Sequence, residues 1–408
     1  MRPSPLHIFS HFSVLPHLVG WRTLGLAFVA RAPQAMLPLG AMTAVRYSTG
    51  SIALAGLATA VVSAASALCA PLIGRWSDQK GQRLVLSVLV PLGVLSLAAL
   101  TWTCVAHTTG PALWAALVAV GATGVQIGTF TRAQWSSAHL TPSQLSAAFS
   151  YESMADETVF VLGPALVGLL ASIAWPIAPL VFAATLMAVS TIPFALKAPR
   201  DTTDHAVNDQ IVRPSIWCVL WRISPALIIM TSLGVFFGST QAGITERATQ
   251  LGNPSMAGLA YAPLGITSAI AALLLVLVPE SFALSKRSLI GGLGIAVTMT
   301  AVWLAPSLPL IATVMFLGGV FIGPTMVTAF SLAHLLAPHG GSAVAMTATG
   351  AGVTVGVAAG AACGGMLAND SASLAFALSG AAGLLIIVIS IVLELKKRVP
   401  SKQKFQVD

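Results

Sequence analysis

Charged residues are scarce in this chain, and this scarcity excludes an ordinary soluble domain. Only 8% of its 408 residues are Asp, Glu, Lys or Arg, whereas 56% are hydrophobic. Soluble domains carry about 25% charged residues, which keep their surface in water. Most of the surface of this chain is therefore expected to face hydrocarbon.

Sequence motifs of enzymes are also missing. The nucleophile motif Gly-x-Ser-x-Gly, the zinc motif His-Glu-x-x-His and a phosphate-binding Gly-Lys-Ser/Thr loop do not occur. The four cysteines are scattered, at Cys69, Cys104, Cys218 and Cys363, and form neither a C-x-x-C pair nor a disulfide framework. We therefore expect no catalytic residue, no metal site and no cofactor, and the chain is not expected to be an enzyme.

Long apolar stretches fill the sequence instead. A membrane helix needs about 20 apolar residues, and windows of this length recur along the whole chain. Residues 1–20 have no cleavage site of the A-x-A type, so no removable signal peptide is expected. We predict twelve transmembrane helices, at about 22–45, 51–73, 84–106, 111–131, 146–173, 177–196, 225–246, 256–278, 288–304, 308–331, 343–368 and 372–393.

The positive charges set the orientation. With the N-terminus inside, all but three of the 20 Lys and Arg residues fall in or beside inner loops. The exceptions are Arg46 and Arg247, at outer helix ends, and Arg31, inside the first helix. Because Lys and Arg favour the cytoplasmic side, we predict a multi-pass plasma-membrane protein with both termini cytoplasmic. The net charge of +8 then needs only the lipid bilayer as a partner, and no nucleic acid.

A short basic turn separates the second and third predicted helices. It runs from Gly74 to Arg83 and reads Gly-Arg-Trp-Ser-Asp-Gln-Lys-Gly-Gln-Arg. This turn resembles the signature loop of the major facilitator superfamily, with Gly74, Asp78, Gly81 and Arg83 at its main positions. The resemblance implies an all-α membrane fold of two pseudo-symmetric six-helix bundles and a role in transport. It also implies that Asp78 lies near the inner start of the eleventh helix, where the helix dipole favours a carboxylate, with Arg83 as a supporting cation.

The two halves of the chain repeat one another weakly. Gly128 and residues 136–142 of the fourth helix match Gly323 and residues 331–338 of the tenth, about 195 residues later. Such a repeat agrees with six helices used twice, as in many transporters. We expect an N-terminal bundle at 1–196, a cytoplasmic linker at 197–224, a C-terminal bundle at 225–395 and a basic cytoplasmic tail at 396–408.

Ionisable residues inside the predicted membrane helices are the sharpest chemical feature. Each costs on the order of 2.5–3.5 kcal/mol on insertion, so it must be paired, hydrated or protonated. Counted from the inner ends at about 1.5 Å per residue, Arg31 lies about 13 Å deep, and Glu152 and Asp156 about 9 to 15 Å deep. We therefore expect Arg31 to pair with Glu152 or Asp156. Glu157 points about 100° away on the same helix, where packing or pairing with Arg132 is expected.

Two interpretations of these charges stay open. The acids can form a static ion-pair network that locks the first, fourth and fifth helices together. Alternatively, at least one acid binds protons reversibly or contacts substrate, and Asp156 is then the first choice for proton coupling because it lies deepest on its face.

Two glycine patterns bear on function. Gly163-Pro164 and Gly168, in the fifth helix, resemble the G-P-x-x-G antiporter motif of drug–proton exchangers, a match that is only partial. A ridge of four glycines in the eleventh helix suits a helix that rocks closely against the other half; it consists of Gly352, Gly356, Gly360 and Gly364.

Polar side chains within the predicted cavity helices are few. A membrane Gln bonds a neighbouring helix more often than a ligand, so these residues are candidates only. The substrate-cavity candidates are Gln34, Gln126, Thr129, Gln241, Thr325 and Thr328.

The sequence as a whole favours a monomeric secondary transporter that exports a small organic molecule in exchange for protons. The resemblance to drug–proton antiporters carries the export direction, and the few polar residues favour an amphipathic substrate. Three alternatives remain: a sugar or metabolite transporter, a sensor that does not transport, and a membrane enzyme or lipid-handling protein. The last would need a catalytic cluster at one interface.

Overall fold

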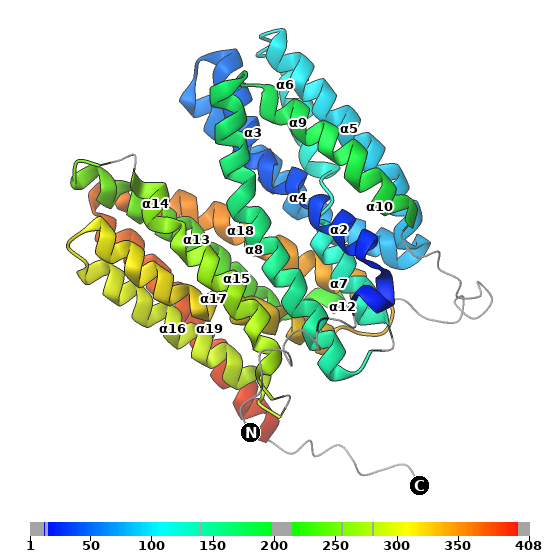
Figure 1. Ribbon diagram of the computed structural model, residues 1–408, viewed down its shortest axis with the longest axis vertical. Coiled ribbons are helices and arrows are strands. Elements are labelled where there is room, and N and C mark those ends of the chain that lie inside the picture. Colours follow the sequence, from blue (N-terminus) through cyan, green and yellow to red (C-terminus); the bar gives the residue numbers. More distant parts are fainter. Residues whose placement is uncertain are drawn as a thin grey trace.

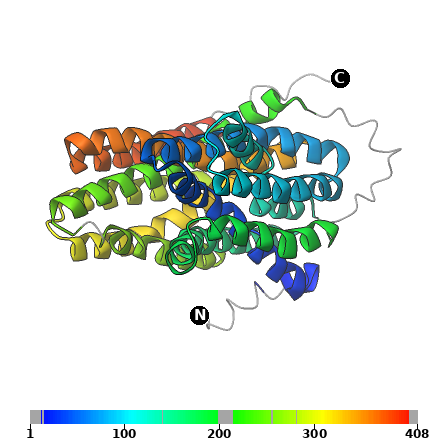
Figure 2. The ribbon, with the colours of Figure 1, turned by 90° about the horizontal axis from the view of Figure 1, so that it is seen from above.

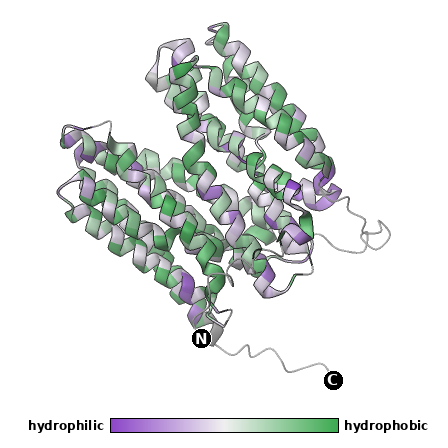
Figure 3. Cartoon of the chain, in the orientation of Figure 1, coloured by the Kyte–Doolittle hydropathy of each residue, from purple (hydrophilic) through white to green (hydrophobic). Residues whose placement is uncertain are grey.

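The computed structural model describes residue 12 and residues 15–138, 140–197, 214–253, 256–279 and 281–398. Within these ranges every regular element is a helix. The predicted linker at 197–224 and tail at 396–408 therefore lie mostly outside the described residues. Hydrophobic residues dominate the lengths of the helices, and hydrophilic ones gather at their ends (Figure 3). This distribution is the one expected of helices that cross a bilayer.

The first group of helices comes from the N-terminal part of the chain (Figure 1). Its helices contact one another around a core of Val, Leu and Ala side chains. The group consists of α2 (Trp21–Val29), α3 (Ala32–Thr49), α4 (Ile52–Lys80), α5 (Gln82–Val105), α6 (Pro111–Ala122), α7 (Ile127–Ser137), α8 (Pro142–Ile173), α9 (Ala178–Leu186), the π-helix η1 (Met187–Thr191) and α10 (Ile192–Lys197).

The second group comes from the C-terminal part, and Figure 2 shows its yellow to red helices on the side opposite the blue and cyan helices of the first group. The short helix α12 (Ile216–Arg222) precedes it and packs on α18 and α4. The group consists of α13 (Ser224–Gln250), α14 (Ala257–Tyr261), α15 (Pro263–Leu274), the 3-10 turn η3 (Leu275–Leu277), α16 (Leu284–Leu304), α17 (Leu308–Leu336), α18 (Ser342–Asp370) and α19 (Ala372–Arg398).

Eleven helical segments in the described residues are long and apolar enough to cross a membrane. They correspond to the predicted spans except the first, which the structure divides into α2 and α3 at Ala30 and Arg31. Gln34 and Arg46 also make α3 more polar than its neighbours. The first predicted span is therefore present as a broken helix, and the break positions Arg31.

The fifth predicted span begins earlier than expected, at Pro142 rather than near residue 146. Thr141 caps the helix, because its side chain accepts a hydrogen bond from the Gln144 backbone while the Gln144 side chain bonds back to Thr141. At about 1.5 Å per residue, Glu152 and Asp156 lie about 15 and 21 Å from the start of α8, deeper than the sequence suggested.

The two groups meet along a few helices only. α4 and α7 contact α18, and α8 contacts α15 and α17. Near the end of α4 that carries Lys80, Asp78 bonds to the first turn of α18. We call this end of the molecule the Asp78 end.

Candidate functional site

Arg31 lies at the break between α2 and α3 and contacts both carboxylates that the sequence offered as its partners, Glu152 and Asp156. Its Nη2 forms an ion pair with Glu152, and its Nε lies 3.1 Å from Oδ1 of Asp156. Arg31 Nη2 also donates to the Thr131 hydroxyl over 3.0 Å, and Thr131 in turn donates to Glu152. The indole of Trp135 donates to the other oxygen of Glu152 over 2.8 Å. Because Glu152 is 1% exposed, these donors replace the water that its charge would need.

Arg132 completes the cluster from α7. Its Nη1 lies 2.7 Å from Oδ2 of Asp156, and its Nη2 donates to the Ser153 hydroxyl over 3.2 Å. The guanidinium is fully buried and lies 3.8 Å above the ring of Phe330, a residue of α17 in the second group. A cation over an aromatic ring is attracted to it, so the cluster of the first group also contacts the second.

A glycine leaves room for this cluster. A Cβ at Gly128 would lie 2.6 Å from Oδ1 of Asp156 and 3.1 Å from Nη1 of Arg132. Gly128 is therefore needed for the close approach of α7 and α8, a reason that its place in the sequence repeat does not give.

Charge balance separates the three acids of α8. Arg31 and Arg132 are bound to Glu152 and Asp156, which makes two cations for two carboxylates. Glu157 is 5% exposed, and its Oε1 has no hydrogen bond. Of the two roles expected for Glu157, pairing with Arg132 is contradicted, and packing is the one that remains. Since Glu157 is turned away from α7 toward α15, Arg132 reaches Asp156 instead.

The signature loop makes a second polar contact between the groups. The Asp78 carboxylate accepts the backbone N–H groups of Ala343 and Val344, over 2.9 and 3.0 Å. Both residues belong to the first turn of α18. Two charge-assisted hydrogen bonds thus join the end of α4 to the positive end of a helix dipole. The resemblance implied this position, and the contact lies there.

Two positions of the loop, Gly74 and Gly81, require glycine for different physical reasons. A Cβ at Gly74 would lie 2.8 Å from the Ala343 carbonyl oxygen and 2.8 Å from the Val344 Cα, so only glycine lets α4 come this close to α18. Gly81 has φ 84° in the turn between α4 and α5, a conformation that favours glycine. Arg83 is half-buried at the start of α5.

A further contact of the loop was not predicted. Arg75 donates to the carbonyl oxygen of Pro214, over 3.0 Å, just before α12. Val219 of α12 and Ile223, which follows α12, in turn pack against Val344 of α18. The segment before the second group therefore contacts the Asp78 end as well, and no sequence pattern predicts this contact.

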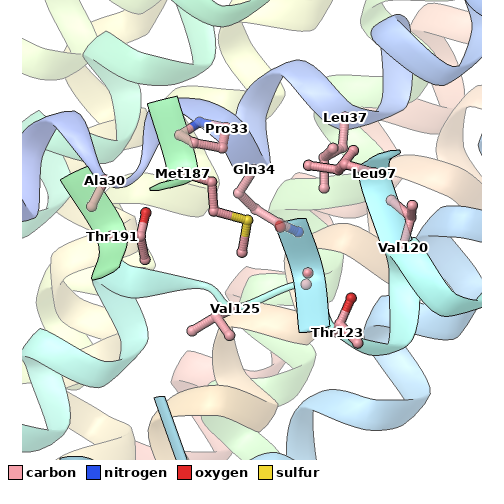
Figure 4. Close-up of a pocket in the computed structure, with 12 residues that line it drawn as sticks. Ala30, Pro33, Gln34, Leu37, Leu97, Val120, Thr123, Val125, Met187 and Thr191 are labelled. Carbon is pink, nitrogen blue, oxygen red and sulfur yellow. The ribbon is translucent and has the colours of Figure 1, made fainter. Parts of the chain in front are cut away.

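Three of the six cavity candidates line two small hollows. Gln34 lies with Thr123, Met187 and Thr191 around a hollow inside the first group (Figure 4). Three irregularities meet there: the break before α3, the non-helical residues 123–126 between α6 and α7, and the π-helix η1. Most of the other side chains around it are apolar.

Gln126 and Thr129 line the second hollow, between α7 and α18. Gln126 donates to Thr354 of α18 over 3.4 Å, so it bridges the two groups. The other three candidates lie apart from both hollows. Thr325 and Thr328 are buried and bond carbonyls of their own helix, and Gln241 is exposed on α13.

The antiporter-like motif has a packing role at one of its positions. A Cβ at Gly163 would lie 2.8 Å from Cβ of Ala35, so this glycine brings α8 against α3. Pro164 lies inside α8, and a Cβ at Gly168 would meet nothing within 4 Å. Only Gly163 is thus required by close packing.

The glycine ridge of α18 packs within the second group, and not against the first as the sequence suggested. A Cβ at Gly360 would lie 2.7 Å from the Cα of Val235, and one at Gly364 would lie 2.6 Å from the Cα of Ser239. Both partners belong to α13, whose own Gly234 and Gly238 face α18. Small residues on both helices let this pair pack closely, so α13 and α18 are expected to move as one body.

The fold and these contacts define a polytopic, all-α membrane protein whose two groups of helices are joined by breakable polar contacts. A model of the Major Facilitator Superfamily matches residues 23–277, more than half of the chain, and the chain belongs to this superfamily. Its fold is that of a transporter, for which a small-molecule substrate and a lipid environment are the expected partners.

Several solved transporter structures are similar in fold. The human organic anion transporter MFSD10 (TETRAN) has a TM-score of 0.68 at 18% identity, covering 90% of this chain and 97% of its own. A bacterial homologue of the iron transporter ferroportin, in an outward-facing state, has a TM-score of 0.65 at 18% identity, and the match covers 92% of this chain and 98% of that one. The transporter FucP, in the outward conformation, has a TM-score of 0.67 at 11% identity, and the match covers 91% of this chain and 97% of that one. Comparison with curated protein sequences gives no match.

Proposed function

We propose that this chain is a secondary active transporter that exports a small organic molecule in exchange for protons, by alternating access. The contact between Asp78 and the first turn of α18 is the observation that supports this most. It holds the two groups together through two hydrogen bonds, which a rocking motion can break and remake without unfolding either group.

The charge distribution supports a cytoplasmic Asp78 end. Arg75, Lys80 and Arg83 lie there, together with Lys286 and Arg287 at the start of α16. Lys and Arg favour the cytoplasmic side of a membrane protein. On this orientation both termini are cytoplasmic, the described conformation is closed to the cytoplasm, and the protein works as a monomer in the plasma membrane.

The lining of the two hollows supports an amphipathic substrate. Gln34, Thr123, Gln126 and Thr129 are surrounded there by Leu, Val, Met and Phe side chains. A sugar would need many hydrogen-bonding partners, whereas an amphipathic molecule needs an apolar wall and a few polar groups. Similar folds carry cargoes as different as an organic anion and iron by their names, so the lining selects the class of substrate.

Transport in proteoliposomes tests the proposal. The purified chain is reconstituted, a pH gradient is imposed, and a panel of amphipathic cations, amphipathic anions and sugars is offered. At least one amphipathic compound should move against its gradient and opposite to the proton flow, and a protonophore should stop it. Liposomes with Asp78→Asn serve as the control. Movement of a sugar alone, or transport indifferent to the pH gradient, would contradict the proposal.

A further inference from the structure

Glu157 differs from Glu152 and Asp156 on α8 because its carboxyl group is not paired with an arginine. It lies about 22 Å along the helix, near its middle, on the face that packs against α15 of the second group. Its carboxyl group lies close enough to interact with Ser268 of α15 and Tyr261 of α14. Yet neither Oε1 of Glu157 nor Oγ of Ser268 has an aligned hydrogen bond, and Ser268 is fully buried.

The contact around Glu157 is tight and contains no cation among the described residues. A Cβ at Gly265 would lie 2.6 Å from Cγ2 of Val161, so a glycine brings α15 against α8 one turn beyond Glu157. Both arginines near α8 are bound to other acids. Besides Glu157, the charged or titratable groups on α8 and on the elements around it are Arg31, Arg132, Tyr151, Glu152, Asp156, Tyr261 and His334, together with Arg46 and Tyr47, which are exposed in the last turn of α3.

A buried carboxylate without a cation costs several kcal/mol, and neutralisation by a proton removes most of this cost. Asp156 adds a negative charge on the next residue, which opposes a second one. A protonated Glu157 can instead donate to the Ser268 hydroxyl and still accept with its other oxygen, which supplies both atoms with the bonds they lack.

We propose that Glu157 is a proton-binding site of the transporter, and that its proton fastens α8 to α15 while the Asp78 end is closed. When the groups separate at that end, water reaches the carboxyl group and the proton leaves to the same side. The O–H bond of the carboxyl breaks, a water molecule takes the proton, and no oxidant or co-reactant is needed. This inference rests on the proposed proton coupling and names its residue. It replaces Asp156, whose charge both arginines already balance.

The pH dependence follows from this exchange. Closure takes up one proton at Glu157, so the ratio of closed to open protein should fall as the pH rises. One linked proton limits the change to about tenfold per pH unit. A neutral glutamine at residue 157 should keep the closed state favoured at every pH.

Distances between spin labels measure this ratio without a substrate. The four cysteines are replaced, and labels are placed at Leu84 of α5 and Leu335 of α17, which are exposed at the Asp78 end. The parent should gain a longer distance as the pH rises from about 5 to 9, with a one-proton slope. Glu157→Gln should hold the short distance throughout, and Ser268→Ala should lower the closed-to-open ratio at low pH several-fold.

Glu246→Gln is the matched control, because Glu246 is a carboxylate at the far end of α13 that bonds Gln250. It should keep the pH response of the parent. The proposal is overturned if Glu157→Gln keeps that response too, or if the parent shows none. The outcome is independent of the transport assay: if Glu157→Gln loses the response while no compound follows the pH gradient, the proton site stands and the proposed export fails.

Discussion

Replacing Arg31 with alanine should be among the most destabilising single changes in this protein. Arg31 is the cation of Glu152, which is 1% exposed and keeps only Thr131 and Trp135 as partners when the guanidinium is lost. Removal of one member of a buried ion pair costs about 3–5 kcal/mol, because the other charge stays buried. We expect the midpoint of heat denaturation in detergent to fall by roughly 10 °C.

The double variant of Arg31→Ala with Glu152→Ala separates a charge effect from a packing effect. Both buried charges leave together, so its loss should be smaller than the sum of the single losses by about 0.5–3 kcal/mol. Arg46→Ala, at an exposed position of α3, is the control and should change the midpoint little. Additive losses in the double variant would show that Arg31 acts through packing alone.

Asp78→Asn should impair the transport cycle far more than the fold. The asparagine Oδ1 can still accept one of the two N–H groups of Ala343 and Val344, but its amide nitrogen cannot accept the other. Hydrogen bonds to a charged group contribute about 1.5–3 kcal/mol. The loss should therefore shift the equilibrium away from the closed Asp78 end by roughly 10- to 100-fold, since each 1.4 kcal/mol is a factor of ten.

Chemical labelling of one cysteine measures this shift. Thr347 is 3% exposed where α18 meets α4, so Thr347→Cys in a background without other cysteines should react slowly with a maleimide. Addition of Asp78→Asn should speed the reaction at least tenfold, while the denaturation midpoint moves little. Ser77→Ala is the matched control, because Ser77 is buried one residue away with a hydroxyl that has no partner. Equal labelling rates with and without the Asp78→Asn change would show that this carboxylate does not hold the end closed.

Sequence alone anticipated the contacts whose physical reason is local. The position of Arg31 at the depth of two acids predicted its ion pairs, because a lone charge is too costly there. The loop from Gly74 to Arg83 predicted the place of Asp78, since its residues resemble a known turn. The apolar windows predicted the helices, because length and composition decide whether a segment spans a bilayer.

Features that depend on the packing of distant helices were not predictable in the same way. Pro33, in the first turn of α3, is a sequence signal for a break of the first span near Arg31. The sequence does not reveal that the guanidinium at this break reaches α8. Trp135 and Phe330 contact the charges only after α7 and α17 are folded beside them. Asp156 faces Arg132 of α7, whereas Glu157 faces Ser268 of α15. Two adjacent acids in a sequence do not reveal which helix each of them faces.

The central claim is that the two groups of helices rock about the charge cluster and open at one end at a time. Distances across both ends test it most directly, with one label pair at Leu84 and Leu335 and another at Val105 and Leu304, which are exposed at the opposite end. The account predicts two populated distances at each end, and any condition that lengthens one pair should shorten the other. A single, unchanging distance at each end, across pH and in the presence of every compound of the panel, would contradict it.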